Sequence, residues 1–455
     1  MRPAISRFAP SPTGLLHAGN YRTAVFAYLF AKHEGGKFIV RIEDTDAARS
    51  KLEYETPIFE VLKWLNIQAD EQYRQSEHRP RHRELLEKLV ADGTAYISKE
   101  TPRAPGDREE VIRFKNSGGE VTFIDVIRGE ITTNITDLGD FIIARSFDEP
   151  VFHFAVVVDD ADEGVTHVIR GEDHISNTAR QMLIQRALGL PVSLYAHLPL
   201  ILDSNHKKLS KRMGAKALTE YQEEGILPEA MLNYIAFLGW NPGDEREYLS
   251  HDELIKAFDI SRVQKGSAIF DEVKLFSVNQ HWMRKLSDNN FITHMKDLRG
   301  LSSHERPRRS FINSEKLLKV VPLLKERAKT FKEARDMIDG ELSCFFTEPK
   351  LDKNLLLAKE LADRPGIAIT ALKGLLEPIK GLSDGLSSEA VKEAIMLFAD
   401  AEEAKGKGGR GAVLWPLRYS LSGQERSPDP FTLISILGIE ESVSRIQKAI
   451  AILGG

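Results

Sequence analysis

The sequence predicts an α/β domain on a parallel sheet, an α+β insertion within that domain, and an all-α C-terminal half. Residues 1–75 alternate between strand, helix and strand patterns. Apolar runs typical of buried strands return after residue 150, and helical periods dominate after residue 310 with almost no strand signal. Alternating strands and helices are typical of α/β folds, whereas uninterrupted helical periods indicate helices packed on helices.

The first segments form a strand–helix–strand unit. Ile5–Ala9 is predicted to be a short strand, a turn rich in Pro and Gly follows, and a helix is expected over about Gly19–His33. The pair Gly35-Gly36 ends that helix, and Lys37–Glu43 forms the next strand. Because such crossovers are almost always right-handed, the two strands should lie parallel, as in a Rossmann-type domain.

Residues 76–150 change character and are predicted to be an insertion. A charged helix at Arg79–Asp92 is followed by a stretch rich in Pro and Gly at Thr101–Gly106. Short β-like runs come next, at Val121–Ile124 and Glu130–Thr133. Helix followed by a run of strands indicates α+β structure.

The parallel sheet is expected to resume after the insertion. Val151–Val158 is almost entirely apolar, which is typical of a strand buried on both faces. Val168–Arg170 leads to a helix at about Thr178–Ala187, and Pro199–Leu202 is predicted as another buried strand.

Helical periods dominate from Leu218 onward. Leu227–Leu238 is a strong example, because Pro228 suits the first turn of a helix. Further helices are expected at Ser314–Lys332, Leu351–Ala362, Ser387–Glu403 and Ser442–Leu453. The predicted domains are a Rossmann-type domain over residues 1–75 and 151–215, an inserted domain over 76–150, a helical connecting domain over 216–309 and a helical region over 310–455.

Composition limits the class of protein. The chain has 455 residues, 42% of them apolar and 28% charged, which is ordinary globular material of two to four domains. Cys344 is the single cysteine, so no disulfide can form within the chain and no zinc site can rest on thiolates. The start of the sequence lacks an apolar core of signal-peptide length, and no apolar stretch approaches the ~18 residues of a membrane span. We therefore expect a cytoplasmic protein with no membrane partner.

A turn rich in Pro and Gly before the first helix is a candidate anion site. The turn runs from Pro10 to Gly14, and His17 and Gly19 stand at the start of the helix. A helix N-terminus presents unpaired N–H groups and about half a positive charge, and glycines let a ligand approach the backbone. Alone, this patch is equally consistent with a β-turn and a capping histidine. The glycine pattern of dinucleotide-binding folds is absent, which argues against a nicotinamide enzyme.

A basic segment follows the last predicted strand of the sheet. Lys207, Lys208, Lys211 and Arg212 place four cations within six residues. An isolated cluster of this kind is more often a solvated surface. Ligands of open α/β sheets bind beyond the carboxyl ends of the strands, however, and a cationic loop there can close over a triphosphate. The two patches together indicate ATP that is used to activate an acid.

Both patches are similar to the signature motifs of class I aminoacyl-tRNA synthetases. The motifs "HIGH" and "KMSKS" are matched by His17-Ala-Gly-Asn20 and by Lys208-Leu-Ser-Lys-Arg212. Longer strings narrow the resemblance to the bacterial-type glutamyl-tRNA synthetase family and extend it over nearly the whole chain. These strings are Arg7–Gly14, Arg41–Asp46, Val156–Asp160, Val168–His174 and Trp415–Arg418.

The resemblance implies roles for individual residues. Arg7 faces the side-chain carboxylate of glutamate, Arg170 anchors a carboxylate, and the positions of Ser11 and Glu43 take the α-ammonium. A substrate with two carboxylates needs guanidinium groups, and an ammonium needs a carboxylate, so the residue types agree with these roles. Without the resemblance, Arg7 and Arg170 would more often only pair with Glu43 or Asp173. The implied ATP contacts are Ser11, Thr13, Gly14, His17, Gly19, Asn20, Lys208, Ser210 and Lys211, of which His17, Lys208 and Lys211 are the implied catalytic residues.

Two departures from the family pattern concern the amino-acid pocket and zinc. Phe152 stands where the family often has Tyr, which removes a hydroxyl that could bond the substrate. Losing one neutral hydrogen bond costs roughly 0.5–1.5 kcal/mol, so glutamate binding should survive with softer discrimination. The stretch Ala95–Pro105, where many members carry a cysteine-rich zinc knuckle, has no Cys. We expect no zinc and no other metal held by the protein alone.

The resemblance also implies the reaction and the partners, which are ATP with Mg²⁺, L-glutamate and tRNA. The α-carboxylate of glutamate attacks the α-phosphate of ATP, and the terminal adenosine of tRNA(Glu) then takes the glutamyl group from the adenylate. No enzyme nucleophile is required, so catalysis rests on positioning and charge neutralisation. Nothing in the sequence demands more than a monomer.

The insertion is expected to contact the acceptor end of tRNA, and the helical C-terminal half the anticodon. Residues 301–340 hold 10 Lys and Arg against 6 Asp and Glu, a local net charge of +4. This excess suits phosphate contacts, although charge alone fits an ordinary charged helix face better. The candidate tRNA contacts are Arg306, Arg308 and Arg309.

Several alternatives remain open. A glutamyl-tRNA synthetase that accepts glutamine tRNA as well, or uses it alone, would carry the same motifs. Glutaminyl-tRNA synthetase ends in β-barrels, which the helical periods disfavour, and the glutamyl-queuosine enzyme lacks a C-terminal half. A non-catalytic tRNA-binding paralogue is disfavoured by the intact His17, Lys208 and Lys211. A small nucleotidylyltransferase would not need so long a chain.

Overall fold

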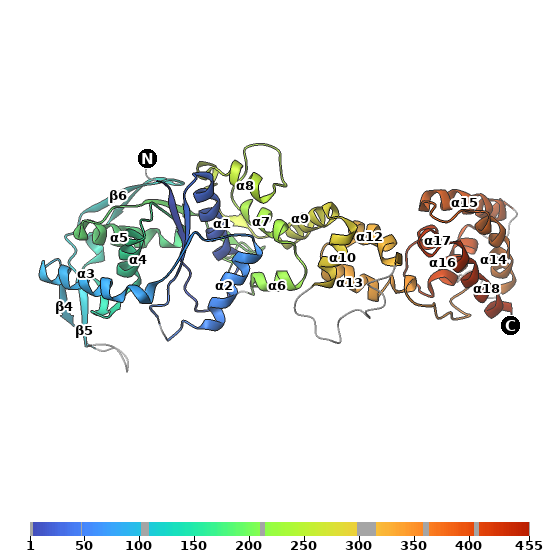
Figure 1. The fold of residues 1–455 in the computed structure, drawn as a ribbon, viewed down its shortest axis with the longest axis horizontal. Coiled ribbons are helices and arrows are strands. Elements are labelled where there is room, and N and C mark those ends of the chain that lie inside the picture. The colour runs from blue at the N-terminus through green and yellow to red at the C-terminus, as the bar shows by residue number, and fades with distance from the viewer. Residues whose placement is uncertain are drawn as a thin grey trace. The chain divides into compact units, whose positions relative to one another are not determined.

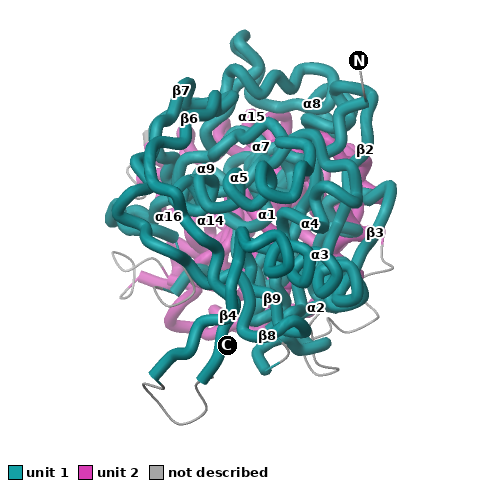
Figure 2. The backbone as a smooth tube through the Cα atoms, turned by 90° about the vertical axis from the view of Figure 1, so that its left-hand side faces the viewer, with its two compact units in different colours: residues 1–222, 226–279 teal, residues 223–225, 280–455 magenta. Residues whose placement is uncertain are grey.

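The structure is a computed structural model. It describes residues 3–46, 48–101, 109–209, 214–297, 315–357, 364–404 and 409–454. The chain forms two compact units (Figure 2). Unit 1 comprises residues 1–222 and 226–279, unit 2 comprises residues 223–225 and 280–455, and the main boundary falls within helix α9 (Glu272–Lys285).

A seven-stranded sheet organises the described residues of unit 1 (Figure 1). Its order is β3-β2-β1-β10-β11-β6-β7, and each neighbouring pair is parallel except the hairpin β6–β7. The first two predicted strands are present and parallel, with Ser6 opposite Phe38. The strands are β1 (Ile5–Phe8), β2 (Lys37–Ile42), β3 (Glu71–Arg74), β10 (His167–Gly171), β11 (Leu194–Leu198), β6 (Glu120–Asp125) and β7 (Gly129–Asn134).

The strand order reverses direction between β1 and β10. From β1 the chain proceeds outward through β2 to β3, and later strands are added on the other side of β1. Loops that leave neighbouring strands at such a switch point run apart and leave a crevice at the carboxyl ends. The turn after β1 and the turn after β10 both face this crevice, so the fold brings the first patch and the Arg170 segment to one place.

Helix α1 (Ala18–His33) begins at the first patch and is buried along almost its whole length. It packs against β1 and also against α7 (Pro228–Ala236) and α8 (His251–Ala257). Gly35 follows the helix with φ of 64°, a conformation that a side chain disfavours. The predicted helix and its glycine stop are therefore confirmed.

The prediction of a strand at Val151–Val158 is wrong, because this segment is helix α4 (Phe152–Asp162). It packs against α3 (Arg79–Ala91), α5 (Ile175–Leu188) and strands β5 (Glu110–Phe114) and β8 (Phe141–Ser146) of the insertion (Figure 1). Phe154, Val156, Val157 and Val158 belong to one apolar cluster with residues of those elements. A helix buried on every side is apolar on every side, so the run carries no 3.6-residue period. Periodicity alone cannot separate such a helix from a buried strand.

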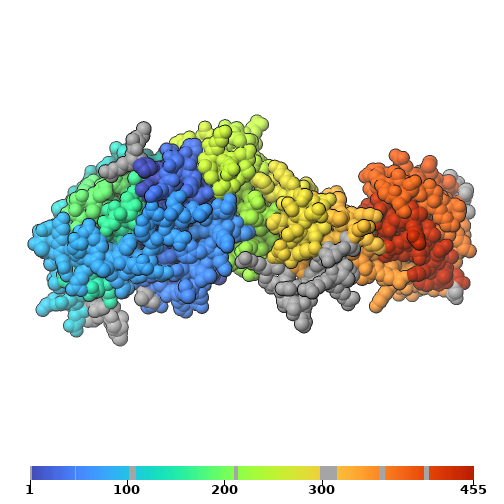
Figure 3. Space-filling model, viewed as in Figure 1, coloured from blue at the N-terminus to red at the C-terminus, as the bar shows by residue number. Residues whose placement is uncertain are grey.

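The insertion divides between two sheets. Strands β4 (Ala95–Lys99), β5 (Glu110–Phe114), β8 (Phe141–Ser146) and β9 (Glu149–Pro150) form an antiparallel sheet of their own. The hairpin β6–β7 instead joins the main sheet, where Asp125 lies opposite Tyr195 of β11. On the face drawn in Figure 3 the insertion, light blue to cyan, lies at the surface of unit 1.

The strand predicted at Pro199–Leu202 is displaced. The central strand is β11, which ends at Leu198, and the chain then leaves the sheet because Pro199 cannot donate to a ladder. Ile201 and Leu202 form the short strand β12 (Ile201–Leu202), which pairs with β13 (Ala268–Ile269). The remaining helices of unit 1 are α2 (Leu52–Trp64), α6 (Leu218–Glu223) and the first part of α9.

The described part of unit 2 is helical. The predicted helices near 387–403 and 442–453 are present. The helix predicted over 314–332 is shorter, because it ends at Arg327 and Lys332 belongs to the next helix, which begins at Phe331. Residues 351–357 of another predicted helix form turns, and its residues 358–362 lie outside the described residues. Within the described residues no helix combines the length and apolarity needed to cross a membrane. The helices are α10 (Asp288–Lys296), α12 (Glu315–Arg327), α13 (Phe331–Asp339), α14 (Pro365–Lys380), α15 (Ser388–Ala404), α16 (Gly411–Ser422), α17 (Pro430–Leu437) and α18 (Ile439–Gly454).

Candidate active site

A cavity of about 570 Å³ occupies the crevice at the switch point of the main sheet. Its wall comes from β1 and the following turn, the start of α1, the start of α4, the end of β10 and the segment after β11. Of the residues predicted for the site, those that line it are Arg7, Ser11, Thr13, His17, Gly19, Asn20, Glu43, Phe152, Arg170 and Lys208. Gly14 does not line the cavity, and Ser210, Lys211, Arg306, Arg308 and Arg309 lie outside the described residues.

His17 caps helix α1 and faces the cavity. Its Nδ1 accepts the backbone N–H of Gly19 at 3.0 Å, and its own backbone N–H donates to Oδ1 of Asn20 at 3.1 Å. A neutral ring whose Nδ1 is an acceptor carries its proton on Nε2, which can donate to an anion. A Cβ at position 19 would lie 2.8 Å from Cε1 of His17, so a side chain there would displace the imidazole ring from its capping position. Asn20, the departure in the fourth position of the motif, acts as the reciprocal cap.

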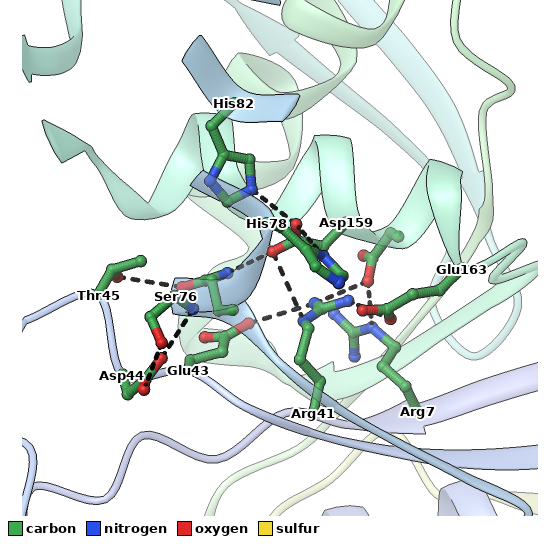
Figure 4. Close-up of polar contacts among 12 residues, drawn as sticks. Arg7, Arg41, Glu43, Asp44, Thr45, Ser76, His78, His82, Asp159 and Glu163 are labelled. Carbon is green, nitrogen blue, oxygen red and sulfur yellow. Dashed lines mark hydrogen bonds and ion pairs between the residues drawn. The ribbon is translucent and has the colours of Figure 1, made fainter. Parts of the chain in front are cut away.

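A buried cluster of carboxylates surrounds Arg41 on one side of the cavity (Figure 4). The Arg41 guanidinium lies 2.8 Å from Asp160, 2.6 Å from Glu163 and 3.3 Å from Glu43. Nε of Arg7 donates to the same Asp160 at 3.0 Å. Burial alone would lower the pKa of Arg41, but the surrounding carboxylates hold it above its ordinary value. Arg7 is therefore held by a shared carboxylate and not by Glu43.

Asp159 connects this cluster to the start of the insertion. Its Oδ1 lies 3.0 Å from Nδ1 of His78 and 2.6 Å from Nε2 of His82, and its Oδ2 accepts from Nε2 of Gln75 at 2.7 Å. Burial would raise the pKa of Asp159, but the two histidines outweigh it and lower that pKa. The pKa of Glu163, in contrast, is raised to about 7, chiefly by burial. The apolar-looking α4 thus carries ionic groups at its C-terminal end.

Arg170 lies on the opposite wall in a different setting. Its Nε donates to Nε2 of His197 at 3.2 Å, and its Nη2 donates to Oγ1 of Thr178 and to Oε1 of Gln181, each at 2.8 Å. Its guanidinium also lies 5.2 Å from the centre of the Tyr195 ring. All these partners are neutral. Burial lowers the pKa of Arg170 to about 10, so the group is still a cation at neutral pH.

Phe152 and His174 form an aromatic edge of the cavity. Phe152 is the first residue of α4, and its ring centre lies 5.5 Å from that of His174. Burial, assisted by the nearby Arg170 cation, lowers the pKa of His174 to about 4. The ring is therefore neutral at neutral pH and adds no charge beside Arg170.

Lys208 stands at the outer rim. Its Nζ lies 2.9 Å from Oδ2 of Asp173, and both side chains are about half exposed, at 53% and 47%. The segment that carries it turns back on itself, since the N–H of Leu209 donates to the carbonyl of Ile201 at 2.8 Å. Asp173 thus pairs with Lys208. The alternative from the sequence, in which Asp173 pairs with Arg170, is wrong.

A model of the family "tRNA synthetases class I (E and Q), catalytic domain" matches residues 4–104 and 101–277, and a model of the "Anticodon binding domain" matches residues 290–450. The protein from Mesorhizobium japonicum named Glutamate--tRNA ligase 1 is 40% identical, with 98% of this chain and 99% of that chain covered. The chain belongs to the glutamate–tRNA ligase family. Glutamate--tRNA ligase of Aquifex aeolicus is 39% identical with 98% of each chain covered.

Solved structures of the family agree with the fold. The glutamate tRNA ligase of Elizabethkingia meningosepticum, solved in complex with its amino acid, is 34% identical and has a TM-score of 0.83, with 99% of each chain covered. The enzyme of Elizabethkingia anophelis is also 34% identical and has a TM-score of 0.81. The resemblance inferred from the motifs and the predicted fold class, a Rossmann-type catalytic domain with a helical C-terminal half, are therefore confirmed.

The structure adds residues to which the sequence motifs assigned no role. Arg22, Thr23 and His174 line the cavity, and Asp125 and His197 stand behind Arg170. Arg22 lies one turn after the histidine motif and donates to the carbonyls of Leu238 and Pro199. The sequence signal for these residues is weak, because a single buried arginine or histidine has no period of its own.

Proposed function

We propose that this protein attaches L-glutamate to the 3′-terminal adenosine of tRNA(Glu) with ATP, through a glutamyl-adenylate. One observation carries the proposal. A single cavity joins a histidine-capped helix N-terminus, which suits phosphates, to two guanidinium groups and a buried carboxylate, which suit glutamate. The names of the relatives agree with this activity, and nothing favours a non-catalytic paralogue.

In the first step the cavity residues hold two anionic substrates in register. Arg170 and Arg7 bind the carboxylates of glutamate, with Arg7 on the side chain, and Glu43 with Ser11 takes the α-ammonium. An oxygen of the α-carboxylate bonds to the α-phosphorus of ATP while the bond from that phosphorus to the bridging oxygen breaks, and pyrophosphate leaves. His17 and the N–H groups at the start of α1 neutralise the nucleotide phosphates.

In the second step a hydroxyl of the terminal adenosine attacks the carbonyl carbon of the adenylate. The ester to tRNA forms, AMP leaves, and the hydroxyl proton passes to the departing phosphate or to solvent. The chain contributes positioning and charge and forms no covalent bond to the substrate.

Mg²⁺ belongs to the proposal only as a companion of the triphosphate. Among the described residues no three or more His, Cys, Asp or Glu side chains are grouped so that they could hold a metal. That the chain holds no zinc stays a prediction from the sequence.

The remaining assignments follow the domains. We propose that residues 76–150 contact the acceptor stem, that residues 216–309 connect and contact the tRNA stem, and that residues 310–455 bind the anticodon. The anticodon-binding model over 290–450 supports the last of these. Arg306, Arg308 and Arg309 are the proposed contacts at its start. A cytoplasmic monomer completes the proposal.

Aminoacylation tests the proposal. Radiolabelled glutamate is incubated with ATP and with purified glutamate tRNA or glutamine tRNA, and ATP–pyrophosphate exchange is measured with and without tRNA. We expect charging of glutamate tRNA. Charging of glutamine tRNA alone would correct the substrate, and tRNA binding with no charging of either tRNA would overturn the enzymatic role.

The lysine loop provides a second test. Lys211→Ala should slow adenylate formation by roughly 10²–10³, the scale for losing one preorganised charge donor. Lys207→Ala removes a cation from the same segment outside the implied machinery and is the matched control. Equal single-turnover rates for the two variants would contradict the role of Lys211.

A further inference from the structure

We infer that Asp125 and His197 are positioning residues that hold the Arg170 guanidinium toward the amino-acid carboxylate, so that the inserted hairpin β6–β7 sets the affinity for glutamate. This inference rests on the proposed role of Arg170 in binding glutamate. It concerns His197, which contacts Arg170, and Asp125, which contacts His197; neither residue lines the cavity.

Asp125 is a fixed carboxylate at the end of β6. It is 1% exposed, and its Oδ1 accepts the backbone N–H groups of Ile127 at 3.0 Å and Arg128 at 2.9 Å. Its Oδ2 accepts the backbone N–H of His197 at 3.1 Å and lies 2.6 Å from Nδ1 of the same residue. Burial would raise the pKa of Asp125, but these hydrogen bonds lower it. The group is therefore an acceptor only.

His197 contacts Asp125 through Nδ1, and both Arg170 and the Thr178 hydroxyl, at 3.2 Å each, through Nε2. One tautomer satisfies all three contacts, because the Thr178 hydroxyl can donate to an unprotonated Nε2. Because Asp125 can only accept, Nδ1 of His197 must donate. The neutral ring then presents a lone pair on Nε2, and Nε of Arg170 donates to it at 3.2 Å. Burial lowers the pKa of His197, which favours this neutral form. The opposite tautomer, or the protonated ring, would direct an N–H at the N–H of Arg170.

The consequence for Arg170 is an oriented cation with no carboxylate among its described partners. Its Nε and Nη2 are occupied by His197, Thr178 and Gln181, all neutral acceptors, which leaves Nη1 for the ligand in the cavity. A guanidinium neutralised by a carboxylate, such as Arg7 beside Asp160, would attract a second carboxylate less strongly. The Asp125 carboxylate accepts its hydrogen bond from His197 and does not contact the guanidinium. The positive charge of Arg170 is therefore not neutralised by Asp125 and can attract a substrate carboxylate.

Asp125→Asn tests the inference most directly. The Asn side chain can donate to Nδ1 of His197 and thereby reverse the tautomer. We expect the Kd for glutamate, measured by calorimetry on the full chain, to rise roughly 10- to 100-fold, the range for losing a hydrogen bond to a charged group. The KM for ATP should stay unchanged.

Two variants of His197 separate positioning from packing. His197→Gln can place an amide oxygen near the position of Nε2 and should keep most of the affinity, whereas His197→Phe cannot accept a hydrogen bond and should lose it. The matched control is His167→Phe, three residues before Arg170 on β10, where the ring packs against Phe30 and does not line the cavity. Its affinity should equal that of the unmodified chain.

The tautomer itself has a readout that needs no substrate. In ¹⁵N spectra of histidine-labelled protein, Nδ1 of His197 should be protonated and Nε2 unprotonated, and Asp125→Asn should reverse the pattern. Equal glutamate affinity of the folded Asp125→Asn variant and the unmodified chain would overturn the positioning role alone. Failure of the unmodified chain to bind glutamate would overturn the proposed function, and this inference with it.

Discussion

The two arginine sites of the cavity are built on opposite principles. Arg41, with Arg7 beside it, is surrounded by Glu43, Asp160 and Glu163, whereas Arg170 is held by a histidine, a hydroxyl and an amide. In the first site the carboxylates exceed the guanidinium groups, so the region attracts a cation. In the second site the guanidinium charge is left for an anion. A substrate that carries an ammonium and two carboxylates has groups that suit both sites, since the ammonium suits the first and a carboxylate suits the second.

The difference also separates stability from binding. Guanidinium and carboxylate groups that neutralise one another in the interior depend on each other to stay buried, and removing one partner exposes the desolvation cost of the rest. The neutral acceptors around Arg170 leave no uncompensated charge behind when the guanidinium is removed. Arg41 should therefore matter most for folding, and Arg170 most for glutamate.

Arg41→Ala should have the largest effect on stability. It removes the guanidinium that Glu43, Asp160 and Glu163 share and should lower the free energy of unfolding in urea by about 3–5 kcal/mol. The matched control is Arg49→Ala, which removes an exposed pair with Asp46 and should cost less than about 1 kcal/mol. Equal losses of unfolding free energy in Arg41→Ala and Arg49→Ala would contradict a role for Arg41 in stability.

Arg170→Ala should act on glutamate more than on folding. We expect kcat/KM for glutamate to fall by roughly 10²–10³, the range for truncating one partner of a buried charged pair, with a smaller loss of stability than in Arg41→Ala. Arg170→Lys keeps the positive charge but lacks the two parallel N–H donors of a guanidinium, so its kcat/KM should lie between those of Arg170→Ala and the unmodified chain. A stability loss equal to that of Arg41→Ala, with kcat/KM unchanged, would contradict the assignment.

Glu163 predicts a pH dependence in the carboxylate cluster. Its pKa is raised from 4.5 to about 7, so the folded chain holds a proton that the unfolded chain releases between these values. The stability from this group is therefore complete below about pH 4.5 and is lost as the pH rises to about 7, by at most about 3 kcal/mol. Urea unfolding of Glu163→Gln should lack this slope. The exposed Glu84→Gln should retain it, and an unchanged slope in Glu163→Gln would refute the shift.

Phe152→Tyr should have the smallest effect. A hydroxyl added at the edge of the cavity beside His174 can bond the substrate, and the KM for glutamate should fall by about 2- to 10-fold, which corresponds to roughly 0.5–1.5 kcal/mol. Phe147→Tyr, outside the cavity lining, is the control. A higher KM in Phe152→Tyr would mean that the phenyl ring itself fits the substrate.

Much of this molecule could be predicted from local patterns. The strand–helix–strand start, the glycine stop at Gly35 and the motif that begins α1 all depend on residues close in sequence. The strand proposed for Val151–Val158 failed because a helix buried on all sides has no polar face to reveal its period. The same helix also buries Asp159 and Asp160, which follow the apolar run directly.

The partners of the site arginines could not be predicted. The pairing of Arg7 with Asp160 has no signal in the sequence, because the two residues are separated by 153 positions. Asp125 lies in a segment taken for an insertion, and its place beside His197 depends on the parallel pairing of β6 with β11. No local period records such a pairing.

The fold class, the family and several of the residues that line the cavity could be predicted from the chain alone, because they follow from short patterns of neighbouring side chains. The partners of each arginine became known from the folded chain, which shows that Arg41 and Arg7 pair with buried carboxylates and that Arg170 does not. Ion pairing depends on distance in space, and the order of the strands brings together groups that lie tens to more than a hundred residues apart in the chain.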